Sequence, residues 1–169
     1  MNWRLAAATV VVAAGCGSES PLITHSTINR LGAWAPPASA TLLKAGNSGL
    51  ENQTFVMVES AAAWQAMWAD AWRGQPATPA LPSVDFVLAS VLVVGTGKRT
   101  GGGYSVTIDS VVVSTNESEL FATATQPASG CPPVAGFSAP VHMVMMPGHP
   151  PIARWNVRIA VAACSAAGR

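Results

Sequence analysis

Alternating hydrophobic and polar positions predict that most of the second half of the chain forms β-strands. Residues 104–114 and 155–162 alternate with a period of two, which places successive side chains on opposite faces of a strand. Residues 85–95 are almost continuously apolar, as expected for a central strand that is buried on both faces or bends midway. Short runs rich in β-branched or aromatic residues predict further strands at 40–45, 53–59, 119–125 and 141–146.

A single amphipathic helix is predicted at residues 61–72. Its apolar positions recur with helical spacing at Trp64, Met67, Trp68, Ala71 and Trp72. Ser60 stands where an N-cap is expected, and Gly74 and Pro76 end the pattern. The apolar stripe predicts that this helix packs flat on a sheet.

These elements predict one α+β domain over residues 40–169. Six or seven strands in hairpin order would form a mainly antiparallel sheet, with the early helix covering one face. A length of 169 residues also fits one domain preceded by a tail. In strand 104–114 the buried face is expected to switch near Asp109.

The first residues have the pattern of an export signal. Arg4 supplies a positive charge, and the uncharged apolar run at 5–14 is shorter than the about 20 residues that a membrane-spanning helix needs. The window ending in Cys16 resembles a bacterial lipobox, although Ala13 stands where leucine is usual. We expect a lipoprotein signal peptide at 1–15 and lipidation of Cys16. An ordinary signal peptide is the alternative.

Export of this kind would place the protein in the bacterial cell envelope. The residue after Cys16 is Gly17 and not the aspartate that often retains lipoproteins at the inner membrane, which favours the outer membrane or cell surface. Residues 16–39 are rich in Ser, Pro, Thr, Gly and Ala and lack an apolar period, so we expect a flexible tether there. The membrane contact would then be the lipid anchor.

Composition argues against a nucleic-acid partner. Half of the residues are hydrophobic, 10% are charged, and the formal net charge is +1. The nine basic residues are scattered, whereas nucleic-acid binding domains cluster theirs. We expect a large core and a lightly charged surface.

Two cysteines remain once Cys16 is assigned to the lipobox. Cys131 and Cys164 form an even pair in an oxidising compartment, and we expect them to form a disulfide. The bridge would stabilise the fold by about 3 to 4 kcal/mol on the chain-entropy model. Two buried free thiols and a metal site are the alternatives, although no zinc-ligand spacing accompanies the pair.

The sequence offers no motif for catalysis. A nucleophilic enzyme needs a nucleophile held by an oriented base, and no Gly-x-Ser-x-Gly elbow is present. His142 alternates with apolar neighbours on a predicted strand, so we expect it on the solvent side or paired with a partner group; His149 lies in a loop. The acidic residues are dispersed. We therefore expect a protein that is not an enzyme and that carries no metal or other cofactor.

A glycine-rich segment at residues 98–104, KRTGGGY, has two interpretations. It is either a hairpin that connects two central strands, with glycine supplying positive φ, or part of a partner-binding surface. In the second case arginine and tyrosine are residue types enriched at binding hot spots. The candidate partner-binding residues are Arg99, Gly101, Gly102, Gly103 and Tyr104, with His142 nearby.

Three stretches of the chain together resemble a known family. They are the strand at 55–58 followed by Trp64 and Trp68, the segment RTGGGYSVTI at 99–108 after Asp85 and Phe86, and residues 127–131 with 139–147. This pattern resembles the C-terminal domain of the PrcB-type protease-complex subunits, a family of small exported bacterial domains. The chain has one extra glycine before Tyr104.

The resemblance implies a non-enzymatic accessory role. The family takes its name from a subunit that supports the assembly or persistence of a surface protease, so the expected partner is an exported protein, plausibly a protease. The alternative is a small ligand-binding lipoprotein or a hydrolase that uses a pocket between helix 61–72 and the sheet.

Overall fold

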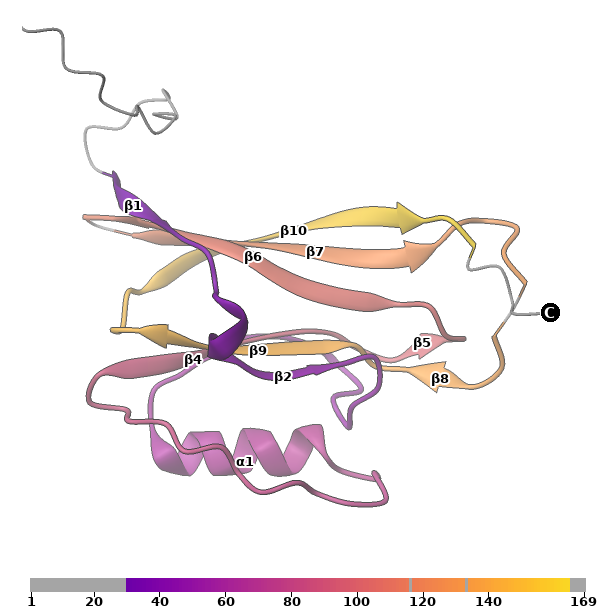
Figure 1. Ribbon diagram of the computed structural model, residues 1–169, viewed down its shortest axis with the longest axis horizontal. Coiled ribbons are helices and arrows are strands. Elements are labelled where there is room, and N and C mark those ends of the chain that lie inside the picture. The colour runs from indigo at the N-terminus through magenta and orange to yellow at the C-terminus, as the bar shows by residue number, and fades with distance from the viewer. Residues whose placement is uncertain (1–29, 116, 133, 165–169) are drawn as a thin grey trace, which may run out of the picture.

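Two four-stranded sheets lie face to face, and one helix covers the outer side of one of them (Figure 1). This computed structural model describes residues 30–115, 117–132 and 134–164. The sheet that lies between the other two layers, here the inner sheet, has the strand order β2 (Thr41–Ala45), β9 (Val141–Pro147), β4 (Ala89–Thr96), β3 (Gln53–Val58). The outer sheet has the order β1 (Arg30–Trp34), β6 (Ser105–Ser114), β7 (Ser118–Pro127), β10 (Ile152–Ala162).

The predicted α+β class is confirmed, but the prediction of one sheet with six or seven strands is wrong. The strands divide into four, four and two, and the third sheet pairs β5 (Arg99–Thr100) with β8 (Phe137–Ser138). The chain leaves β7, passes through β8 and β9, and returns to the outer sheet as β10. As a result β10 pairs with β7 in parallel, whereas the other strand pairs are antiparallel.

Strand β4 is buried along its whole length, as its continuous apolar sequence predicts. Val91 and Val93 pack toward helix α1 (Ala61–Ala71), and Leu92 and Val94 pack toward the outer sheet. The strand begins at Ala89 and not at residue 85, because a turn precedes it in which Asp85 accepts hydrogen bonds from following backbone N–H groups.

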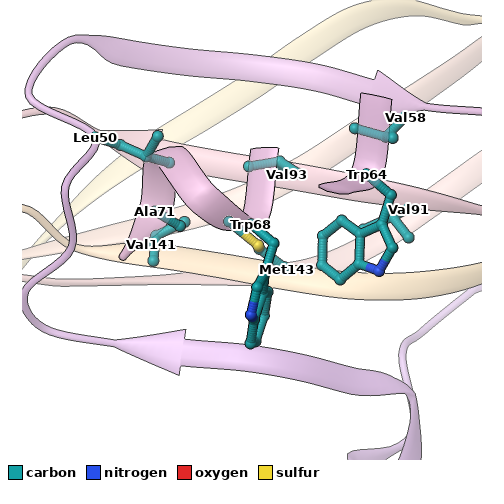
Figure 2. Packing of buried hydrophobic residues seen from close by; sticks show 9 residues of the cluster. All are labelled: Leu50, Val58, Trp64, Trp68, Ala71, Val91, Val93, Val141 and Met143. Carbon is teal, nitrogen blue, oxygen red and sulfur yellow. The ribbon is translucent and has the colours of Figure 1, made fainter. Parts of the chain in front are cut away.

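Helix α1 follows the predicted pattern closely. Ser60 caps it by accepting a hydrogen bond from the backbone N–H of Ala63 at 3.3 Å. Figure 2 shows Trp64 and Trp68 within the cluster of buried side chains between the helix and the inner sheet. Their indole N–H groups donate to the carbonyls of Pro82 and Pro79 at 2.9 and 3.0 Å, so the proline-rich loop after the helix satisfies both donors.

The N-terminal part of the described chain corrects the predicted tether. Strand β1 pairs with β6 at the edge of the outer sheet, and a short 3₁₀ helix at Ala38–Ala40 leads into β2. Residues 30–39 therefore belong to the fold. The predicted signal peptide, Cys16 and the first part of the predicted tether lie outside the described residues.

Gly49 is packed against the end of helix α1, and we expect its replacement by alanine to be destabilising. A Cβ atom there would lie 2.3 Å from the carbonyl oxygen of Asp70 and 2.7 Å from that of Arg73. These are backbone atoms, so Gly49→Ala should cost about 1 to 3 kcal/mol in the free energy of unfolding, as overpacking does.

Gly46→Ala is the matched control, because its nearest atom would lie 3.9 Å away. Urea unfolding of both variants measures the difference. Equal stability of the two variants would contradict the close packing at residue 49.

Candidate functional site

The glycine-rich segment crosses from one sheet to the other. It connects β4 of the inner sheet to β6 of the outer sheet, so the prediction of a hairpin between two strands of one sheet is wrong. Midway the segment forms β5, which pairs with β8 at the end of the molecule where the label C stands in Figure 1. The N–H of Gly101 donates to the carbonyl of Gly136 at 2.9 Å, and the hydroxyl of Ser138 donates to the carbonyl of Gly101 at 2.8 Å.

Glycine is required at the three consecutive positions for two different physical reasons. Gly101 and Gly103 have φ angles of 93° and 86°, a conformation that other residues rarely adopt. Gly102 is not in that region. A Cβ atom on Gly102 would instead lie 2.9 Å from a side-chain carbon of Val134, so this glycine allows close approach of the neighbouring loop.

The predicted disulfide is confirmed. Cys131 and Cys164 are bonded, with their Cα atoms 5.2 Å apart. The bridge ties the start of the loop that carries Val134 and Phe137 to the residues after β10. It therefore restrains the loop that packs on the glycine-rich segment.

Exposed apolar side chains gather beside this crossing. Val134 and Phe137 are 59% and 64% exposed. The ammonium nitrogen of Lys98 lies 4.7 Å from the centroid of the Phe137 ring, within the range of a cation–π contact. We call the surface around the crossing the crossover face: Lys98 and Phe137 lie on one side of the β5–β8 pair, Arg99 and Tyr104 lie on the other side, and Val134 packs on Gly102.

Arg99 contributes positive charge to the crossover face. Its guanidinium donates to the carbonyl of Thr96 at 2.8 Å. Within the part of the chain that the structure describes, no carboxylate lies within 4.0 Å of it, whereas Lys98 pairs with Glu51 at 3.1 Å. The charge of Arg99 is therefore available to another molecule.

His142 lies in the interior, so its assignment to a partner-binding surface is corrected. The residue is 4% exposed, because β9 belongs to the inner sheet and is covered on both faces. Its Nδ1 accepts a hydrogen bond from the backbone N–H of Ile108 at 2.8 Å, and its Nε2 lies 3.3 Å from the hydroxyl oxygen of Thr41. The imidazole joins the two sheets.

Burial lowers the pKa of His142 to about 4. The nearby positive charge of Lys44 lowers this pKa further, and the negative charge of Asp109 acts in the opposite direction. The ring is therefore neutral near pH 7. Since Nδ1 accepts a hydrogen bond, the proton is on Nε2, which can donate to Thr41.

The space between helix α1 and the inner sheet is filled by side chains, as Figure 2 shows for Trp64 and Trp68. The predicted alternative pocket at that interface is thus occupied by the core. A cleft of about 660 Å³ lies instead beside the C-terminal end of the helix. Its walls include Arg73 and Asp70, which form an ion pair, and Lys98 and Phe137 of the crossover face.

Two further properties concern residues 30–115, 117–132 and 134–164, the described ranges. They contain no group of three His, Cys, Asp or Glu side chains placed to share a metal ion. Nor do they contain a helix with the length and hydropathy needed to cross a membrane.

The comparison with known families identifies the central part of the chain. The family model for the PrcB C-terminal domain matches residues 90–147. The match covers about a third of the 169 residues. No curated protein and no solved structure matches the chain.

The segment that matches the family model contains the whole crossover face. It includes the glycine-rich segment, Val134, Phe137 and His142. Helix α1, β1 and β10 lie outside the match. The disulfide therefore links the matched segment, through Cys131, to the residues after the last strand.

Val134 and Phe137 were not predicted from the sequence as part of the site. They lie in the glycine- and proline-rich segment between β7 and β9, which shows no alternating pattern. An aromatic residue in such a segment, away from any core pattern, is the signal that could have identified Phe137.

Proposed function

We propose that this protein is a non-enzymatic accessory domain that binds another exported protein through its crossover face. The observation that carries the proposal is an exposed aromatic ring, Phe137, on one side of the β5–β8 pair and an arginine without a carboxylate partner, Arg99, on the other. Aromatic and arginine side chains are enriched at the centres of protein interfaces. The PrcB C-terminal match supports a partner that belongs to a protease complex.

The crossover face is held in place before a partner binds. The pairing of β5 with β8, the packing of Val134 on Gly102 and the disulfide all restrain it. A surface that is ordered in advance loses less conformational entropy on binding. This supports recognition of a folded partner by a rigid face.

The histidine environments support a non-enzymatic role. His142 is buried with both ring nitrogens engaged, and Nδ1 of the exposed His149 lies 3.4 Å from a carboxylate oxygen of Glu59. Among the described residues, neither histidine forms a hydrogen bond with a serine, threonine or cysteine side chain at an open site. The one contact of this kind joins His142 to Thr41, and it lies in the interior.

We further propose that lipid on Cys16 holds the domain in the cell envelope. Support comes from the sequence alone, namely Arg4, the apolar run at 5–14 and the lipobox-like window. Intact-mass measurement on the membrane fraction should find a mature chain that begins with a diacylated Cys16. A soluble, unlipidated chain would contradict the anchor.

Two substitutions on the crossover face should weaken partner capture without unfolding the domain. Arg99→Ala and Phe137→Ser each remove an exposed side chain, so the free energy of unfolding should change by no more than about 0.5 kcal/mol. Each should weaken binding by about fivefold or more, which corresponds to the hot-spot threshold of about 1 kcal/mol.

The measurement is quantitative capture of the partner from the native cell envelope by tagged variants. Arg154→Ala is the matched control, because Arg154 is an exposed arginine near the start of β10, at the opposite end of that strand from the disulfide. Undiminished capture by both crossover variants would remove the basis for the proposal.

A further inference from the structure

A small cavity lies behind Arg99, between the end of β4 and the outer sheet. Its volume is about 70 Å³. Most of its wall surface is apolar, and the residues that line it include Thr96, Arg99, Tyr104, Ala124, Gln126 and Ile159. Arg99, Gln126 and the adjoining Ile159 are exposed, so the cavity opens at the molecular surface. We call it the Arg99 notch.

The volume of the notch limits the size of the group that it can bind. A water molecule occupies about 30 Å³ in the liquid, and sites for whole small-molecule ligands measure about 300 to 1,000 Å³. A space of about 70 Å³ therefore admits the end of a side chain or a small ion, but no cofactor.

The polar groups of the notch favour a negatively charged guest. The guanidinium of Arg99 has five N–H donors. Among the described residues, it donates one hydrogen bond, to the backbone carbonyl of Thr96. The side-chain hydroxyl of Thr96 is buried in the wall and has no hydrogen-bond partner among the residues that are described. This hydroxyl oxygen is itself buried and not accessible from the notch, so the donors open to a guest are those of Arg99.

A carboxylate fits these groups better than other side-chain ends. It accepts two hydrogen bonds from a guanidinium in a planar arrangement, which a neutral amide matches less well. A cation would be repelled by Arg99. Ile159, which is 69% exposed at the rim, offers an apolar surface for the methylene groups of a glutamate side chain.

We propose that the Arg99 notch binds the carboxylate of an acidic side chain of the partner protein. The inference rests on the proposed function and adds the chemistry of recognition to it: the partner presents a glutamate or aspartate that inserts beside Arg99 while Ile159 contacts its methylene groups.

The single tyrosine of the chain provides the test, because Tyr104 lines the notch. Full-length protein with ¹³C-labelled tyrosine rings gives ring signals that come from this residue alone. The probes are a blocked pentapeptide with a central glutamate and the same peptide with glutamine. We expect a saturable shift with the glutamate peptide and about tenfold weaker binding of the glutamine peptide.

Three variants show whether the shift reports the notch. Arg99→Gln should abolish saturation, because it removes the charged donor. Thr96→Val, which replaces a buried hydroxyl with a methyl group of similar size, and Arg154→Gln, at the other end of β10, should bind as the wild type does. Saturable binding that persists unchanged in Arg99→Gln would overturn the proposal, as would the absence of any saturable shift.

Acetate distinguishes a side chain from a free anion. If acetate saturates the signal at concentrations equal to or below those of the glutamate peptide, the notch binds a free small anion and the assignment to a partner side chain is wrong. Because these titrations contain no partner, they are independent of the capture experiment. Failure here with Phe137-dependent capture intact would leave the proposed function standing.

Discussion

Replacing His142 with alanine should lower the free energy of unfolding by about 3 kcal/mol or more at pH 7. The imidazole accepts the backbone N–H of Ile108 at a point where the register of β6 against β7 shifts. Its removal leaves that buried donor without a partner and opens a cavity between the sheets. Urea unfolding at pH 7 measures the loss.

His149→Ala is the control, because His149 is an exposed residue whose ring contacts Glu59 at the surface, so its loss should change stability by no more than about 0.5 kcal/mol. His142→Asn is the informative second variant. Its side-chain oxygen can replace Nδ1 as the acceptor, so we expect part of the stability to return. Similar stability of the two alanine variants would contradict the interior role of His142.

The same residue should make stability depend on pH. Burial lowers the pKa of His142 to about 4 in the folded protein, whereas the ordinary value is 6.5. Between these values the unfolded chain binds more protons than the folded protein does, so stability rises with pH from about 4 to 6.5. The full contribution, about 3 kcal/mol, is present above pH 6.5 and is lost as the pH falls through this window.

The difference between wild type and His142→Asn isolates this group from other titrating residues. We expect the stability advantage of the wild type to shrink as the pH falls from 7 to 4.5. The pKa itself follows from the His142 ring signals in an NMR titration. Parallel pH profiles for the two proteins would show that the imidazole does not titrate in this range.

Removing the disulfide should produce the second large loss of stability. Cys131→Ala with Cys164→Ala opens a loop that spans a sequence separation of 33, and the chain-entropy model gives about 3 to 4 kcal/mol for such a loop. We expect the fold to persist, since the two sheets and the helix retain their cores.

The double variant should also weaken partner capture, because the bridge restrains the loop with Val134 and Phe137. Unfolding curves and capture are measured on the same preparation, and peptide mapping without reduction verifies the wild-type bridge. Unchanged stability and unchanged capture would contradict a role for the bridge in holding the crossover face.

The elements that the sequence predicted are those with a local pattern. Helix α1 carries its own cap and apolar period, and the run of apolar residues in β4 indicated burial on both faces. The switch of face near Asp109 corresponds to the irregularity between Ile108 and Ser110. Each of these signals lies within a dozen residues of sequence.

Pairing between distant segments was not predictable in this way. Hairpin order is the usual default for successive strands, but β8 and β9 separate β7 from β10 and make their pairing parallel. The two-residue strands β5 and β8 are too short to show an alternation. His142 was misplaced because alternation on a strand says which residues share a face, not whether that face is covered.

Residue type and motif identified only some of the residues of the candidate site. Arg99, Tyr104 and the three glycines followed from the segment at 98–104, and the disulfide followed from cysteine count and compartment. Val134 and Phe137 reach the same end of the molecule through a packing contact with Gly102 and through β8, which only the three-dimensional arrangement shows.

The central claim is that the crossover face is where another exported protein binds. Site-specific photocrosslinking in the native envelope tests it directly, with a photoreactive residue placed at Phe137 and, as a control, at Gln65 on the exposed side of helix α1. We predict a single specific adduct with an exported protein from position 137 and none from position 65. Absence of an adduct at 137, or an equal yield of the same adduct at 65, would contradict the claim.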